Sequence, residues 1–373
     1  MEWKITLSEP TIGQEEIDAV TKVLKSNWLT MGAVTAEFEQ KFAEKMDVKY
    51  AIAVNNATAA LHLANRALGI GTDDEVICPA LTFVASANAT KYTGAEVIFA
   101  DSISEEDLTV DPKDIVKKIT SRTKAITVVH YAGFSCLMDD ILEIAEKYNL
   151  KVIEDCAHAP FAKYRFRDGS EKSIGSIGDI GCFSFFGNKN MTTGEGGMVT
   201  TNNKDLADKL KLLRSHGMTS LTYERHKGHA NNYDVILNGY NYRMDEIHAA
   251  IGIEQLKKID KNNEARRNIY KYYCELLREN SNIIVPFTDR DVNNSVCHIM
   301  PVIVKNNYAE IKAELKGAGV QTSKHYDLIP SFTAYNVEFQ SKIKYISNIL
   351  TLPMSPQMTK EDVEYVTSHI NSK

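Results

Sequence analysis

Polar residues with catalytic potential stand at the ends of short apolar runs in this 373-residue chain. Asp155 is the last residue of the run KVIED (151–155). Ser184 lies just before a turn rich in glycine and threonine (187–197), and Lys189 lies within that turn. Each has an ordinary interpretation: a strand-end acid in water, a strand hydroxyl and a solvated lysine. In the functional interpretation, the acid fixes a positive charge on a ligand and the serine donates to a phosphate. Position alone leaves both interpretations open.

Together with Thr58 and Phe83, these residue types match the requirements of Schiff-base chemistry with pyridoxal phosphate. That chemistry needs an amine nucleophile, an acid against the pyridine nitrogen, donors for the phosphate, and a flat group over the ring. Lys189 is the candidate amine and Asp155 the candidate acid. The acid keeps the ring nitrogen protonated, which makes the ring an electron sink.

Other chemistries find little support in the sequence. The run GEGG (194–197) lacks the G-x-x-x-x-G-K-[ST] pattern of a phosphate loop. No histidine pair at i, i+4 accompanies a glutamate, so we expect no metal site of the zinc-hydrolase type. A G-x-S-x-G elbow is absent, as is a G-x-G-x-x-G after the first strand, which disfavours serine hydrolases and dinucleotide-binding oxidoreductases.

The elements that must position these residues alternate along the chain. Apolar runs predict strands, and helical stripes predict helices between and before them. Strands and helices in alternation favour an α/β fold with a mostly parallel sheet and helices on both faces. Ligands bind at the carboxyl ends of such strands, where the polar candidates fall. The predicted strands are 50–54, 75–79, 96–100, 125–130 and 151–155, and the helices are 14–26, 36–46, 57–68, 82–92, 112–119 and 138–149.

The second half of the chain changes character. Residues 178–201 hold two strand-like runs around the turn, a polar helix follows at 203–215, and 219–240 is expected to be a long loop. A long helix starts at Asp245 and extends toward residue 270. Strands at 282–286 and 298–304 and helices at 308–319 and 360–370 predict a smaller α+β domain. The expected division is 1–245 and 246–373.

Composition describes an ordinary globular protein. Lys and Arg total 43 against 49 Asp and Glu, giving a formal charge of −6, and 43% of residues are hydrophobic. Without a basic tract, we expect no nucleic-acid partner. No apolar stretch is long enough to span a bilayer, and no secretory signal is visible. Six scattered cysteines are expected to be reduced, as in a cytoplasmic protein.

Several longer strings resemble the nucleotide-sugar aminotransferases of the DegT/DnrJ/EryC1/StrS family. They occur in order over nearly the whole chain: SNWLTMG (26–32), NNATAALHLA (55–64), CPALTFVASANA (78–89), HYAGFSCLMD (130–139), VIEDCAHA (152–159), FSFFGNKNMTTGEGGMV (183–199) and GYNYRMDEIHAAIGIEQL (239–256). The resemblance implies the fold type I architecture of pyridoxal-phosphate enzymes, with a seven-stranded large domain and a smaller C-terminal domain. It also implies a homodimer with shared active sites.

The resemblance also implies roles for residues at matching positions. Lys189 matches the lysine that carries the cofactor as a Schiff base, and Asp155 matches the acid on its ring nitrogen. Asn241 matches an asparagine that reaches the phosphate from the partner subunit. The remaining matches are Phe83 over the ring, His158 at its phenolic side, Ala57, Thr58 and Ser184 at the phosphate, Arg243 assisting Asn241, and His325 near the sugar, while Asn188 departs from the family's common pair before the lysine and bears on sugar specificity.

The function implied is transamination. L-glutamate donates its amino group through pyridoxamine phosphate to a keto sugar, expected to be a 4-keto-6-deoxy sugar on a nucleotide diphosphate. The alternatives are a 3-dehydratase or an amino-acid aminotransferase of the same fold, and a catalytically silent binding protein. The family's dehydratases carry histidine in place of Lys189, and the intact lysine and aspartate disfavour a silent protein.

Overall fold

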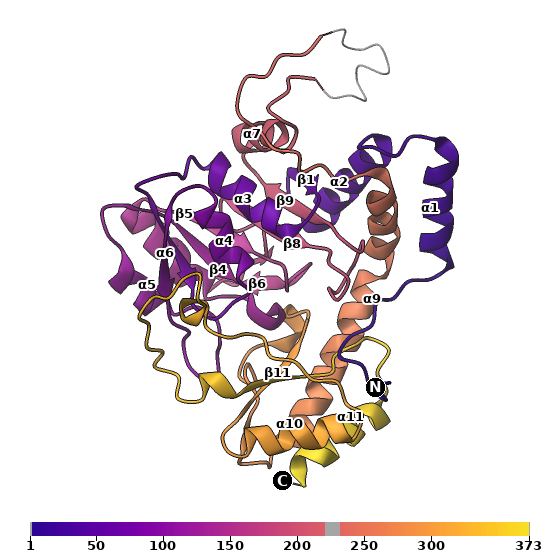
Figure 1. Cartoon of the computed structure of the whole chain (residues 1–373), viewed down its shortest axis with the longest axis vertical. Coiled ribbons are helices and arrows are strands. Elements are labelled where there is room, and N and C mark those ends of the chain that lie inside the picture. Colours follow the sequence, from indigo (N-terminus) through magenta and orange to yellow (C-terminus); the bar gives the residue numbers. More distant parts are fainter. Residues whose placement is uncertain (1, 221–231, 373) are drawn as a thin grey trace.

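A computed structural model describes residues 2–220 and 232–372. Figure 1 shows a large α/β part above a smaller part, with the long helix α9 (Glu246–Leu277) running from one to the other. The expected loop at 219–240 lies partly outside the described residues, which omit 221–231.

The large part is built on a seven-stranded sheet in the order β1-β9-β8-β5-β4-β2-β3. The pairs from β8 to β3 are parallel, whereas β9 runs antiparallel to both of its neighbours. The strands are β1 (Tyr50–Val54), β2 (Glu75–Pro79), β3 (Glu96–Ala100), β4 (Thr123–Val129), β5 (Lys151–Asp155), β8 (Ile180–Ser184) and β9 (Gly197–Thr201). The expected fold class, a mostly parallel sheet flanked by helices with a smaller second part, is confirmed.

Helices cover both faces of this sheet because alternate strand residues feed two separate cores. In β1, Ile52 packs with α3 and α7, whereas Ala53 packs with α2 and α9. Asn56 caps α3 by accepting the N–H of Ala59 at 2.8 Å. The helices of the large part are α1 (Gln14–Ser26), α2 (Ala33–Met46), α3 (Ala57–Ala67), α4 (Ala85–Lys91), α5 (Pro112–Lys118), α6 (Met138–Tyr148) and α7 (Lys204–Arg214).

The smaller part is a three-stranded antiparallel sheet, β10-β11-β12, packed on helices. Its core joins the C-terminal half of α9 to α10 and α11. The start of the chain also lies here, because Ile5 pairs with Val320 and is buried in the same core. The elements are β10 (Ile283–Ile284), β11 (Met300–Val304), β12 (Ile349–Leu352), α10 (Tyr308–Gly317) and α11 (Lys360–Asn371).

Several elements differ from the prediction. The hairpin β6 (Lys163–Arg165) and β7 (Glu171–Ser173) and strand β12 were not expected, since short runs carry little periodicity. Helix α4 begins at Ala85 instead of residue 82.

Within the described chain, no helix has the length and apolar character needed to cross a membrane. Short 3₁₀ turns occur at Tyr131–Gly133, Val292–Asn294, Ile329–Ser331 and Ile346–Asn348.

Candidate active site

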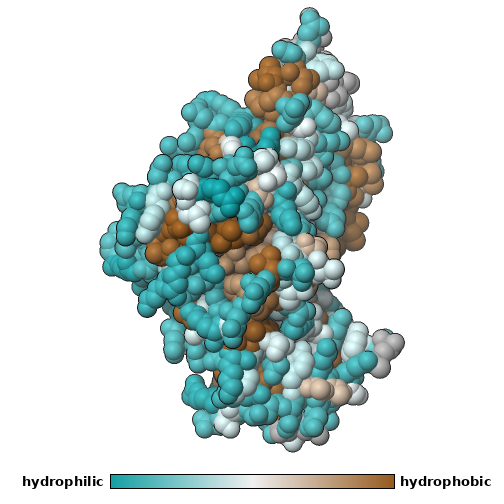
Figure 2. Space-filling view, turned by 60° about the vertical axis from the view of Figure 1, so that its left-hand side comes forward, coloured by the Kyte–Doolittle hydropathy of each residue, from teal (hydrophilic) through white to brown (hydrophobic). Residues whose placement is uncertain are grey.

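A cavity of about 800 Å³ opens at the carboxyl ends of β1, β2, β5 and β8. Exposed aromatic side chains lie at its wall, with Phe83 56% and Tyr92 58% exposed. Figure 2 shows apolar patches on one face of the molecule, framed by hydrophilic surface. The structure brings these predicted residues together in the cavity lining: Ala57, Thr58, Phe83, Asp155, His158, Ser184, Asn188, Lys189 and His325.

Asp155 presents a buried carboxylate to this cavity from the end of β5. Ser86 donates its hydroxyl to Oδ2 at 2.7 Å, and the N–H of Ala157 donates to Oδ1 at 3.1 Å. Burial raises the pKa of Asp155, and these two hydrogen bonds and the nearby Lys189 oppose the rise. A cationic ligand group in the cavity would therefore favour the ionised carboxylate.

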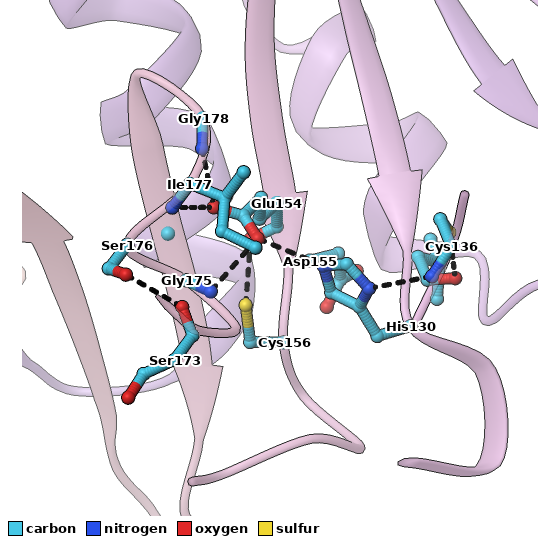
Figure 3. Close-up of polar contacts among 12 residues, drawn as sticks. His130, Cys136, Glu154, Asp155, Cys156, Ser173, Gly175, Ser176, Ile177 and Gly178 are labelled. Carbon is cyan, nitrogen blue, oxygen red and sulfur yellow. Dashed lines mark hydrogen bonds and ion pairs between the residues drawn. The ribbon is translucent and has the colours of Figure 1, made fainter. Parts of the chain in front are cut away.

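The neighbouring acid, Glu154, points to a different environment (Figure 3). Its carboxylate accepts the N–H groups of Gly175, Ile177 and Gly178 at 2.7–2.9 Å and lies 3.1 Å from Nε2 of His130. With Cys156, these two side chains place three potential metal-ligand atoms within 4.8 Å of one another. The backbone bonds already occupy the carboxylate, so its visible role is to hold the turn before β8.

Lys189 supplies the amine of the cavity. Withdrawal from water lowers the pKa of Lys189 to about 8, and the attraction of Asp155 opposes this. A pKa of about 8 leaves about a tenth of the amine unprotonated at pH 7, far more than an ordinary lysine has, and a nucleophile or proton acceptor requires this form.

His298 is a neighbour of this lysine that the sequence did not indicate. Its Nε2 lies 3.4 Å from Nζ of Lys189, although the two residues are 109 positions apart. The only local signal was its place at the start of the predicted strand 298–304, and that pattern carries no chemical meaning. The histidine is buried, with 3% of its surface exposed.

The N-terminus of α3 forms another wall of the cavity. Ala57 and Thr58 begin the helix, and the first N–H groups of a helix find no partner within it. Such groups, together with the helix dipole, attract anions. Two further polar atoms of the lining, Oδ1 of Asn55 and Oδ1 of Asn188, are buried without a hydrogen-bond partner in the part of the chain that the structure describes.

His158 and Tyr326, from distant segments of the chain, form an aromatic pair in the cavity lining. The N–H of Ala132 donates to Nδ1 of His158 at 3.3 Å, so in the neutral ring Nε2 carries the hydrogen. Burial holds the pKa of His158 well below its usual value, which favours that neutral ring. Nε2 lies 2.8 Å from the hydroxyl of Tyr326, which therefore accepts. Tyr326 also lies beside Phe83, with 5.9 Å between ring centroids.

Two predicted residues lie outside this lining. Asn241 is exposed, and Arg243 pairs with Val54 at the end of β1. Tyr242, between them, reaches the cavity. Nη1 of Arg243 is buried without a hydrogen-bond partner among the described residues.

Comparison with known proteins agrees with this architecture. The model of the DegT/DnrJ/EryC1/StrS aminotransferase family matches residues 10–371. The chain belongs to this family. The expected family and the expected enzyme class, an aminotransferase with the pyridoxal-phosphate-dependent fold, are thus confirmed.

Similar family members come from several bacteria. The dTDP-3-amino-3,6-dideoxy-alpha-D-galactopyranose transaminase of Aneurinibacillus thermoaerophilus is 40% identical, covering 96% of this chain and 95% of that protein. The UDP-4-amino-4,6-dideoxy-N-acetyl-beta-L-altrosamine transaminase of Campylobacter jejuni is 36% identical, covering 97% and 95%. The PMP form of the putative sugar aminotransferase Spr1654 from Streptococcus pneumoniae has a TM-score of 0.89 at 28% identity, covering 98% of both chains.

Proposed function

We propose that this family member uses pyridoxal phosphate to transfer an amino group from L-glutamate to a keto group of a nucleotide-linked 6-deoxy sugar. The observation that carries the proposal is the placement of the Lys189 amine and the buried Asp155 carboxylate in one cavity. The start of α3 lines that same cavity and offers an anion site.

The donor set fits the cofactor. The amine of Lys189 is suited to hold its aldehyde carbon, and Asp155 its ring nitrogen. Ala57, Thr58 and Ser184 offer backbone and hydroxyl donors to the phosphate. Phe83 supplies a flat apolar face, and the unpartnered Oδ1 of Asn188 is a polar atom that a ligand would satisfy.

When bound, pyridoxal phosphate supplies an electron sink for the carbanion formed on the substrate. Lys189 first holds the cofactor and, once released, moves a proton at Nζ as general acid and base. The carboxylate of Asp155 keeps a positive charge on the ring nitrogen. His158 and Tyr326 orient one another at the edge of the cavity, and His325 is the candidate contact to the sugar.

The substrate class rests on the relatives. Both named transaminases have products that are 6-deoxy amino sugars on a nucleotide, but their amino groups stand on different carbons. A 4-keto-6-deoxy sugar is our preferred acceptor. Asn188, beside the lysine, is the proposed residue of sugar specificity.

We also propose a homodimer with shared active sites. Asn241 is exposed and lies outside its own cavity, as a residue serving the partner's phosphate site would. Arg243, with its unpartnered Nη1, is the proposed assistant there.

Two half-reactions test the function. L-glutamate added to the yellow purified enzyme should bleach it, and one member of a panel of nucleotide-linked 3-keto and 4-keto sugars should restore the colour. Bleaching without restoration by any sugar would overturn the proposed acceptor. A yellow protein that glutamate leaves unchanged would overturn the proposed donor.

The same experiment separates the alternatives. A 3-dehydratase would release a deoxygenated sugar and no stable amino sugar, which mass spectrometry of the product distinguishes. A silent binding protein would stay colourless with added cofactor.

A further inference from the structure

His298 stands directly behind the candidate cofactor lysine, and its hydrogen bonds can be assigned one by one. Asn190, the residue after Lys189, forms hydrogen bonds with both the ring of His298 and the backbone carbonyl of Val296. Its Nδ2 is 2.8 Å from the carbonyl oxygen of Val296 and 2.8 Å from Oδ1 of Asn263. A carbonyl oxygen only accepts, so this atom of Asn190 must be the donating amide nitrogen.

The orientation of Asn190 then fixes the tautomer of His298. The amide oxygen of Asn190 lies 2.9 Å from Nδ1 of His298 and only accepts, so Nδ1 carries the hydrogen. Burial holds the pKa of His298 well below its usual value, which keeps the ring neutral. Nε2 therefore presents a lone pair, and it does so 3.4 Å from Nζ of Lys189.

The backbone of His298 is held as firmly as its ring. Its N–H donates to the carbonyl of Ala132 at 2.8 Å. Its carbonyl accepts from Nη1 of Arg266, which also donates to Met354. Segments of both parts of the molecule thus fix this imidazole against the lysine.

We propose that His298 is a positioning residue for Lys189, accepting an N–H of the ε-amino group through Nε2 and so aiming the amine into the cavity. Asn190 and the carbonyl of Val296 hold it in the accepting tautomer. The functional consequence rests on the proposed role of Lys189. With this role for His298, the smaller part of the molecule helps to position the amine that binds the cofactor and moves protons.

Other titratable groups surround the pair, and they stay constant in the test. Asp155 attracts the lysine, whereas His158, His325 and Arg266 act on His298 from neighbouring segments. Only the group at position 298 needs to change.

Two substitutions separate the two sides of the ring. His298→Gln can place an oxygen near the position of Nε2 and keep an acceptor for Lys189. His298→Asn can keep the bond to Asn190 but is too short to reach the lysine. Both variants replace the ring by a neutral amide and differ in length by one methylene, so each is the control for the other.

The measurement is the rate at which added pyridoxal phosphate recombines with the cofactor-free full-length protein, followed by absorbance across pH. Protonation of Lys189 slows this step, so the rate rises with pH through the pKa of its amine. An acceptor favours the charged amine, and a charge-assisted hydrogen bond corresponds to about one pH unit. We expect His298→Asn to lower the midpoint by about one unit and His298→Gln to stay close to the wild type. Equal midpoints in both variants, or any other order, would overturn the proposal.

A second measurement uses only the wild-type protein, so it does not depend on whether a variant folds. In nitrogen-15-histidine-labelled wild-type protein, His298 should show a protonated Nδ1 and an unprotonated Nε2 at neutral pH. The opposite tautomer or an imidazolium would overturn the proposal. The two measurements keep the proposed function and the proposed role of His298 apart. A wild type that takes up no cofactor would refute the function, and the tautomer of His298 would still test its hydrogen bond to Lys189.

Discussion

At the scale of single residues, two adjacent acids have different surroundings. Glu154 and Asp155 follow one another in β5, and side chains of a strand alternate between its faces. Asp155 lines the cavity with two donors on its carboxylate, and Glu154 is enclosed by backbone N–H groups. Identical chemistry thus yields one proposed cofactor ligand and one structural anchor.

Asp155→Asn keeps the size of the side chain and removes its charge. We expect kcat of the glutamate half-reaction to fall about 10²–10³-fold, the usual cost of losing one charge-stabilising group. Cofactor should still bind, because Lys189 and the start of α3 remain. Stopped-flow absorbance measures both. The exposed Asp205→Asn is the matched control, and equal rates in the two variants would contradict the role of Asp155.

At the scale of elements, buried polar side chains fix the turns that carry the site. Glu154 joins β5 to the turn at 175–178 that leads into β8, the strand that ends at Ser184. Gly175 has φ of +90°, and a Cβ there would lie 2.4 Å from the ring of Phe183. This turn therefore requires both a glycine and a buried acceptor.

Glu154→Gln should destabilise the fold strongly. An amide offers one acceptor oxygen where the carboxylate has two, and its NH₂ would face backbone donors. We expect a loss of about 3–5 kcal/mol in the free energy of unfolding, as for other broken buried charge networks. Urea denaturation measures it. Glu96→Gln, in an exposed ion pair with Arg122, should cost less than about 1 kcal/mol. Similar losses in both variants would argue against the anchor.

At the scale of the whole molecule, burial of histidines links stability to pH. Burial lowers the pKa of His62 and His325 to about 4 and holds those of His158 and His298 well below 6.5. In the unfolded chain, each histidine has a pKa of about 6.5. Below that pH the unfolded chain binds protons that the native protein does not, so stability falls as pH falls.

The thermal midpoint should therefore drop from pH 7 to pH 5. Each of these four histidines contributes about 1.4 kcal/mol per pH unit in the steep part of this range. Buried His130 acts in the opposite direction above about pH 6, because its contacts with Cys136 and Glu154 outweigh burial and raise its pKa to about 9. His62→Asn should flatten the dependence by about one proton, which denaturant titrations at several pH values would measure. A midpoint that stays level from pH 7 to pH 5 would contradict the lowered pKa values of these four histidines.

Subunit sharing is testable by mixing inactive variants. Lys189→Ala and Asn241→Ala homodimers should each be impaired, the first by about 10²–10⁴-fold because its acid–base group is lost. If Asn241 serves the partner's site, a mixed dimer contains one site with both defects and one intact site. Subunit exchange should then restore turnover to as much as half of the wild-type rate per mixed dimer. No recovery, despite exchange confirmed by native mass spectrometry, would refute shared sites.

The sequence by itself determined the seven strands of the main sheet and the helices between them, because hydrophobic periodicity is local, but it missed the short hairpin β6–β7. It also determined which residues follow the strands, and so placed Lys189, Asp155 and Ser184 near one edge of the sheet. The fold class and the family followed from these patterns and motifs. Roles of single residues, and the boundary at 245, stay predictions.

Tertiary structure alone decided what meets across long separations. It brought His298 to Lys189 and Tyr326 to His158. It also placed Ile5 in the core of the C-terminal part. The physical reason is that such contacts depend on how distant elements pack and on which buried polar atoms then find partners, and neither is encoded in a local period.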